Sequence, residues 1–187
     1  MRVYILWLLL LSQSAQSSDL VKAAKERLNH LVIYDGSYQT IDYPMGDVDA
    51  NKGVCTDVII RSYRVLGIDL QQRVHEDMTA HFDSYPTIWG LSKPDSSIDH
   101  RRVPNLETFF KRHGENLPVS KQAKDYQPGD VVTWRLKGNN LPHVGIVSDT
   151  KAESGRNEII HNIGWGPQSD DILFEHPIVG HFRYPIQ

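Results

Sequence analysis

Apolar residues recur at helical spacing in two stretches of the first third of the chain. After residue 18 they fall on one stripe that predicts a helix, and these positions are Leu20, Val21, Ala24, Leu28 and Leu31. From Cys55 onward the helical spacing returns at Val58, Ile59, Val65 and Leu66. Gly67 stands where a helix C-terminus favours glycine. Cys55 is therefore predicted to lie at the N-terminus of a buried helix.

The second half of the chain changes from helical to strand-like patterning. A short helix is expected from Leu106 to Arg112, between Pro104-Asn105 and Gly114. Apolar runs then predict strands over residues 131–134, 143–147, 158–161 and 178–184, and a polar hairpin loop over 149–157. Helices followed by an antiparallel sheet predict an α+β fold. Residues 34–54 and 73–103 show no helical period and are predicted to be irregular.

The first residues have the layout of a secretory signal peptide. Arg2 precedes an unbroken apolar run over residues 3–11, and a small, polar exit with Ala15 and Ser17 follows. The run is too short to span a bilayer core of about 30 Å as a permanent helix, although an N-terminal anchor is the alternative. We expect residues 1–17 to be removed and residues 18–187 to form one periplasmic or secreted domain without stable membrane insertion.

The charge balance argues against a nucleic-acid partner. The whole chain carries a formal net charge of −3, and residues 1–17 hold one Arg and no acid, so the mature chain would carry −4. A nucleic-acid-binding domain normally shows a basic patch or stripe instead. With no repeat and no low-complexity tract, the mature chain is expected to be a single monomeric domain.

The single cysteine of the chain limits the roles that a thiol can have in this protein. Cysteines of exported proteins usually form disulfides, but Cys55 has no partner within the chain. It is therefore either an inert buried residue or a reactive thiol. A helix N-terminus favours the thiolate, which is the nucleophilic form, and a nearby imidazole would favour it further.

Two of the nine histidines stand where they can assist such a thiol. His143 opens one predicted strand and His161 ends the next, so a hairpin can bring them side by side. His143 would act as the base, and His161, or Asn162 beside it, would fix its tautomer. A histidine at a strand end can also be simply solvated.

These motifs resemble, in order, those of the NlpC/P60 papain-like cysteine peptidases, which cleave peptides of peptidoglycan. The resemblance rests on Cys55 at a helix start, Pro128-Gly129-Asp130 entering a strand, the run His143-Val144-Gly145-Ile146-Val147, and His161. It implies a papain-like α+β fold, with N-terminal helices packed on an antiparallel sheet, and catalytic roles for Cys55, His143 and His161. Tyr43 resembles the active-site tyrosine of that family, where it would contribute to the oxyanion or substrate site, or it can equally be a packed loop aromatic.

A closer resemblance is to the DUF1287 family, across nearly the whole mature chain. The runs that carry it include residues 34–38, 42–47, 53–57, 99–106 and 161–164. The sequence departs from common NlpC/P60 patterns at Thr56-Asp57, where Ser-Gly usually follows the cysteine, and in a long middle segment over residues 68–127.

Further residues are candidates for binding substrate. Arg101 and Arg102 can grip carboxylates, or they can belong to an internal salt-bridge network. Asp57 can bind a substrate ammonium, or it can cap the helix start. Trp165 can form a rim of the cleft. There is no cysteine pair and no HExxH spacing, so we expect neither a metal nor another cofactor.

The expected function is that of an exported cysteine hydrolase that cleaves amide bonds in peptidoglycan stem peptides. Two alternatives remain open at this point. One is a thiol acyltransferase or transpeptidase acting on envelope substrates. The other is a catalytically inactive module that uses the same cleft to bind the cell envelope.

Overall fold

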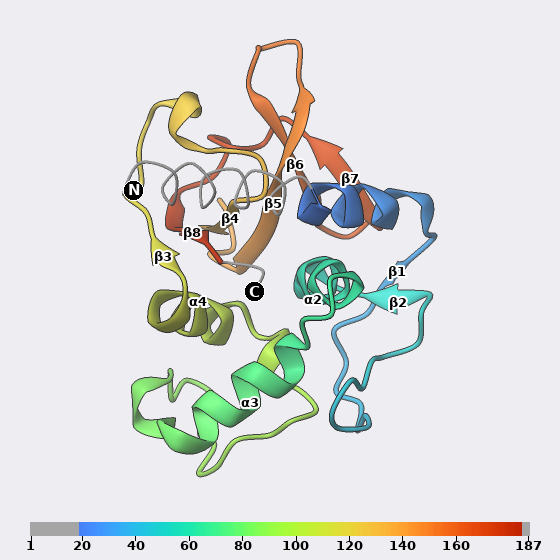
Figure 1. Ribbon diagram of the computed structural model, residues 1–187, viewed down its shortest axis with the longest axis vertical. Coiled ribbons are helices and arrows are strands. Elements are labelled where there is room, and N and C mark those ends of the chain that lie inside the picture. Colours follow the sequence, from blue (N-terminus) through green and yellow to red (C-terminus); the bar gives the residue numbers. More distant parts are fainter. Residues whose placement is uncertain (1–18, 185–187) are drawn as a thin grey trace, which may run out of the picture.

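A computed structural model describes residues 19–184, and the predicted signal peptide lies outside them (Figure 1). The helices cover residues 19–26, Cys55–Val65 (α2), Leu70–Ala80 (α3) and Val103–His113 (α4). Short 3-10 turns lie at Arg27–Asn29 (η1), Phe82–Ser84 (η2), Asp99–Arg101 (η3) and Ala123–Asp125 (η4). Within residues 19–184, no helix is long and apolar enough to cross a membrane.

Within the described residues, eight strands form two sheets. They are Ile33–Tyr34 (β1), Lys52–Gly53 (β2), Glu115–Asn116 (β3), Val131–Arg135 (β4), Pro142–Lys151 (β5), Asn157–Asn162 (β6), Pro167–Asp170 (β7) and Ile178–Arg183 (β8). The large sheet is antiparallel, in the order β3-β8-β4-β5-β6-β7. Figure 1 shows α2 and α4 between this sheet and α3. The predicted α+β architecture, with helices packed on an antiparallel sheet, is confirmed.

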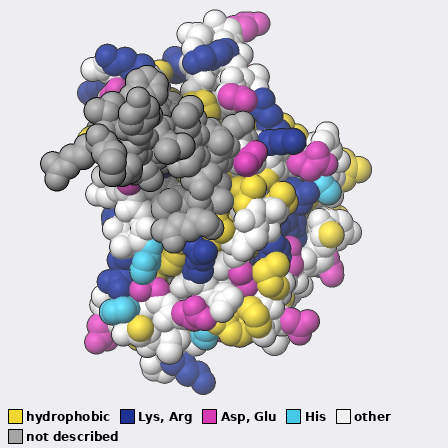
Figure 2. All heavy atoms as spheres, viewed as in Figure 1, with side chains coloured by type: hydrophobic (Ala, Val, Ile, Leu, Met, Phe, Trp, Pro, Cys, Tyr) yellow, Lys and Arg dark blue, Asp and Glu magenta, His cyan; other side chains and the backbone are white. Residues whose placement is uncertain are grey.

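The two faces of the large sheet are covered by separate apolar clusters. Val144 and Ile146 of β5 belong to the cluster that includes Cys55 and the apolar faces of α2, α3 and α4. Trp134 of β4 and Val147 of β5 belong to the cluster on the other side. This division follows from the alternation of side chains along a strand. Outside the core, Figure 2 shows acidic and basic side chains interspersed over the visible face.

The helix α3 lies in a region that was predicted to be largely irregular, and that prediction is wrong. Leu70, Val74 and Met78 of α3 are buried, but they supply only one apolar residue per turn among polar neighbours. Asp69 caps the helix by accepting the backbone N–H of Gln71. The edge strand β7 was also missed, because its residues are half-buried and show no apolar alternation.

The Pro-Gly-Asp turn before β4 ties two strands together. The carboxylate of Asp130 is fully buried and accepts hydrogen bonds from His181 Nε2 at 2.8 Å and from the Arg183 guanidinium at 2.8 and 3.0 Å. It also accepts the backbone N–H of Gln127. The aspartate of this motif therefore has a structural role, which is to join the start of β4 to β8.

Candidate active site

Cys55 is the first residue of α2, as predicted, and its side chain is almost buried, with 5% of the residue exposed. The preceding Val54 is extended, and its N–H donates to the Asp57 carboxylate at 2.6 Å. This contact satisfies one of the free N–H groups that every helix start presents. The sequence therefore places the thiol at the positive end of the helix dipole.

Burial is the main influence on the pKa of the Cys55 thiol, and it makes the thiol less acidic. The pKa of Cys55 is raised to about 12, because the effect of burial outweighs the backbone N–H of Val144, which lowers the pKa, and the Asp57 carboxylate adds to the rise. The thiol is therefore protonated at neutral pH in this structure. This differs from the sequence-based expectation of a thiolate at a helix N-terminus, because loss of hydration outweighs the helix dipole.

His143 and His161 lie side by side on β5 and β6, as the hairpin predicts. His143 Nε2 is 3.0 Å from His161 Nδ1, and the rings meet at 87°. On its far side, His161 Nε2 is 3.1 Å from Asp170 Oδ2 on β7. Two imidazoles and a carboxylate thus form a continuous hydrogen-bonded chain. Asp170 was not predicted, because it lies on the unrecognised edge strand.

His143 is neutral in this setting. Burial, followed by the neighbouring His161, lowers the pKa of His143 to about 3. Its hydrogen bond to His161 uses Nε2, and among the described residues its Nδ1 atom has no hydrogen-bond partner. That nitrogen can therefore serve as a base.

Cys55 and His143 both line one cavity of about 830 Å³. Side chains alternate along β5, so Val144 faces α2 while the His143 ring lies with Trp134 on the other face. The two residues thus approach the cavity from different sides of the strand. Within residues 19–184 no hydrogen bond joins the thiol to an imidazole, and the groups directed at sulfur are the backbone N–H groups of Val144, Thr56 and Cys55.

Tyr34 and Tyr38 line this cavity, whereas the predicted Tyr43 does not. Tyr43 is exposed and packs edge-on against the His75 ring, and it does not line the cavity. Tyr34 does line it, because the parallel pairing of β1 with β2 brings Tyr34 beside Gly53 at the entrance to α2. Burial, followed by Cys55 and Asp57, raises the pKa of Tyr34 to about 12, so its hydroxyl keeps its proton.

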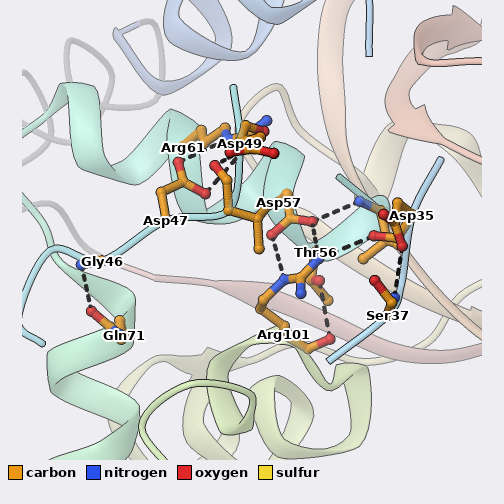
Figure 3. A network of polar contacts seen from close by, with 12 residues as sticks. Asp35, Ser37, Gly46, Asp47, Asp49, Thr56, Asp57, Arg61, Gln71 and Arg101 are labelled. Carbon is orange, nitrogen blue, oxygen red and sulfur yellow. Dashed lines mark hydrogen bonds and ion pairs between the residues drawn. The ribbon is translucent and has the colours of Figure 1, made fainter. Parts of the chain in front are cut away.

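Asp57 and Arg101 are joined in a buried ion pair (Figure 3). Arg101 Nε and Nη2 donate to the two Asp57 oxygens at 2.9 and 3.0 Å. The Thr56 hydroxyl donates to the Arg101 carbonyl, which fixes η3 against α2. Asp57 caps the helix and Arg101 anchors the middle segment, which are the structural roles that were weighed against substrate binding. Arg101 also lines the cavity.

Arg102 lies differently from its neighbour. Its guanidinium stacks over the Trp89 ring at 4.2 Å from the centroid and borders the cavity. Its contact with Asp99 is long, at 3.5 Å. Arg102 thus borders the cavity without a close ion pair, and its role in binding substrate stays a prediction. Trp89 lines the same cavity.

Asn162 and Trp165 do not line the cavity. Asn162 is buried, and its Oδ1 accepts the Gly164 N–H, so it shapes the turn after β6. Trp165 is 88% exposed, while Ile163 and Gly164 of the same turn line the cavity. Asn162 thus has a role in the turn, and Trp165 lies at the surface next to residues that line the cavity; their roles at the site stay predictions. Across residues 19–184, no group of three or more His, Cys, Asp or Glu side chains is arranged to hold a metal ion.

Acid should destabilise the fold through its buried neutral histidines. Burial lowers the pKa of His100 and of His143 to about 3, from an ordinary value of 6.5. Between these values the unfolded chain binds protons that the folded chain excludes. This contribution to stability is therefore complete above pH 6.5 and is lost as the pH falls toward 3, at up to about 1.4 kcal/mol per pH unit for each histidine.

Urea unfolding at pH 7 and pH 5 should show this loss. His100→Asn should reduce the difference between the two pH values, whereas the control His30→Asn, at an exposed position, should not. A free energy of unfolding that stays constant over this interval would contradict the prediction.

Comparison with known proteins assigns the chain to a family. The model of the family described as "Domain of unknown function (DUF1287)" matches residues 21–184. The chain belongs to the DUF1287 family. The resemblance found in the sequence is thereby confirmed, and it spans every element of the site described above.

The DUF1287 chain also resembles individual proteins. It is 50% identical over 172 residues to "Uncharacterized protein YijF" of Escherichia coli (strain K12), which covers 92% of this chain and 83% of that protein. Among solved structures, NlpC1 and NlpC2 from Trichomonas vaginalis superpose with TM-scores of 0.48 and 0.46, at 19% and 17% identity. Both matches cover 89% of this chain, which spans 44% and 46% of those chains, less than half their length.

Proposed function

We propose that this DUF1287 protein is an exported cysteine hydrolase that cleaves amide bonds in peptidoglycan stem peptides. The observation that supports it best is the cavity shared by Cys55 and His143. One wall carries a thiol at a helix N-terminus, and another carries an imidazole whose Nδ1 has no partner among residues 19–184. These are the two groups that nucleophilic acyl transfer requires.

The resting pair is a neutral thiol and a neutral imidazole. His143 Nδ1 takes the thiol proton as sulfur attacks the amide carbon, which forms a C–S bond and a tetrahedral oxyanion. The oxyanion collapses to a thioester, the C–N bond breaks, and His143 gives its proton to the departing amine. Water then attacks the thioester with His143 again as base, which releases the acid and restores the thiol. Catalytic contacts that are long in the free enzyme commonly shorten when substrate binds.

Two donors can stabilise the oxyanion. The backbone N–H of Cys55 lies in the first turn of α2, where N–H groups lack intrahelical partners. The Tyr34 hydroxyl borders the same cavity and keeps its proton. Preorganised donors of this kind lower the barrier by about 3 to 4 kcal/mol each in acyl transfer.

The charge of the cavity wall favours an anionic substrate. Arg101, Arg102 and Lys137 line the cavity, and none of the described residues that line it is Asp or Glu. This pattern contrasts with the acidic balance of the chain as a whole. Peptidoglycan stem peptides carry several carboxylates, which an arginine can bind through two parallel hydrogen bonds.

Digestion of purified peptidoglycan tests the proposal. The protein beginning at residue 18 is incubated with peptidoglycan, and the soluble fragments are analysed by mass spectrometry. Cleavage of a stem-peptide amide is expected, with one new amine and one new carboxylate per event. A parallel digestion with an added amine acceptor detects transfer in place of hydrolysis. Absence of any cleaved or transferred product would overturn the proposal.

The buried thiol favours a second candidate, an inactive module that binds the envelope through the same cavity. Burial raises the pKa of Cys55 to about 12, and a thiol without assistance is a poor nucleophile at neutral pH. Alkylation of Cys55 by iodoacetamide separates the two candidates. Reaction at pH 7 that His143→Ala slows supports catalysis, whereas no reaction below pH 9 supports the binding module.

A further inference from the structure

The edge strand β7 brings a carboxylate to the far end of the histidine pair. Asp170 is the last residue of β7, and its side chain is 45% exposed, whereas the side chain of His161 is 1% exposed. Asp170 Oδ2 is 3.1 Å from His161 Nε2. The buried His143–His161 pair is thus connected to the protein surface through the Asp170 carboxylate.

The chemistry of that acceptor determines which nitrogens carry protons. An ionised carboxylate can only accept a hydrogen bond, so His161 Nε2 must be the donor. In a neutral His161, Nδ1 is then bare and must accept from His143, whose Nε2 therefore carries the proton. In a neutral His143, Nδ1 is left as a lone pair.

This arrangement of hydrogen bonds requires both imidazoles to be neutral, and both are. Burial lowers the pKa of His161, and burial followed by His161 lowers that of His143. The charged and titratable groups that act on His161 are Asp170, Glu175 and His176. His143 is affected by His161 and His176.

We propose that Asp170 is a positioning residue that holds the His143–His161 pair in the tautomer with a bare Nδ1 on His143. This inference rests on the proposed function, in which that atom removes the Cys55 proton. With the opposite tautomers, His143 Nδ1 would carry a proton and could not act as base. The negative charge of Asp170 also stabilises the positive charge that His143 gains during attack, because the His161 ring connects the two groups.

The test compares Asp170→Ala with a matched neighbour. Asp170→Ala removes the acceptor outright, whereas Asn could still accept through its carbonyl. Asp170→Glu restores an acceptor in nearly the same place. Asp171→Ala is the control, because Asp171 pairs with Arg156 and Ser154 and does not contact the histidines.

Long-range nitrogen–proton NMR spectra of the ring nitrogens report the tautomers directly. In the wild-type protein and in Asp171→Ala, His143 should be protonated at Nε2 and bare at Nδ1. Asp170→Ala should give a mixture of tautomers, and the rate of Cys55 alkylation by iodoacetamide should fall by about 10-fold or more at pH 7. Asp170→Glu should restore both readouts toward the wild type.

An unchanged His143 tautomer and an unchanged alkylation rate over pH 6–9 in Asp170→Ala would overturn the inference. That result leaves the proposed function intact if the wild type cleaves peptidoglycan. Conversely, a tautomer shift in a protein that cleaves nothing would support the positioning role and refute the hydrolase.

Discussion

Cys55→Ala should abolish amide hydrolysis while leaving the fold intact. The substitution removes the nucleophile, and no other thiol in the chain can replace it. Loss of a nucleophile of this kind lowers kcat by about 10⁴-fold or more. The side chain is small, so the free energy of unfolding should change by only about 1 kcal/mol. Release of stem-peptide fragments measures the first effect, and urea unfolding measures the second.

Ser62→Ala is the matched control for Cys55→Ala. Ser62 is fully buried on the same helix, and its hydroxyl donates to the Val58 carbonyl. It does not line the cavity, so the variant should keep its activity. Hydrolysis by Cys55→Ala at the wild-type rate would show that sulfur takes no part in the reaction.

The local parts of this site could be predicted from the sequence. Helical spacing after Cys55 and a glycine at residue 67 were enough to place the thiol at a helix start. Alternating apolar runs placed His143 and His161 on adjacent strands, where they form a hydrogen bond. Each inference depends on short-range periodicity, which a sequence records directly.

The parts that depend on contacts between distant segments could not be predicted. Tyr34 reaches the cavity through a two-residue parallel pairing of β1 with β2, and no motif in the chain signals that pairing. Asp170 lies on a polar edge strand without alternation. Arg101 and Asp57 are 44 residues apart, and only the structure shows that they neutralise each other. Burial of the thiol likewise results from packing of the whole chain.

Replacing Arg101 by Leu should destabilise the protein strongly and make the thiol less acidic. Asp57 is 3% exposed and its bidentate partner Arg101 is 7% exposed, so the substitution leaves a buried carboxylate without a counter-charge. Breaking such a pair from one side costs about 3 to 5 kcal/mol. The unneutralised Asp57 also raises the pKa of Cys55 further. Urea unfolding and the pH profile of Cys55 alkylation measure the two effects.

Two further variants separate loss of the ion pair from loss of side-chain volume. Arg101→Lys keeps the charge but loses the bidentate geometry, so its stability should lie between those of the wild type and Arg101→Leu. Arg102→Leu removes the neighbouring guanidinium, which has only a long contact with Asp99, and should cost about 1 kcal/mol or less. If Arg101→Leu were as stable as Arg102→Leu, with an unshifted alkylation profile, the ion pair would neither hold the middle segment on α2 nor shield the thiol from Asp57. The Asp57–Arg101 ion pair would then be dispensable, and the Asp57 carboxylate would have to be protonated or hydrated.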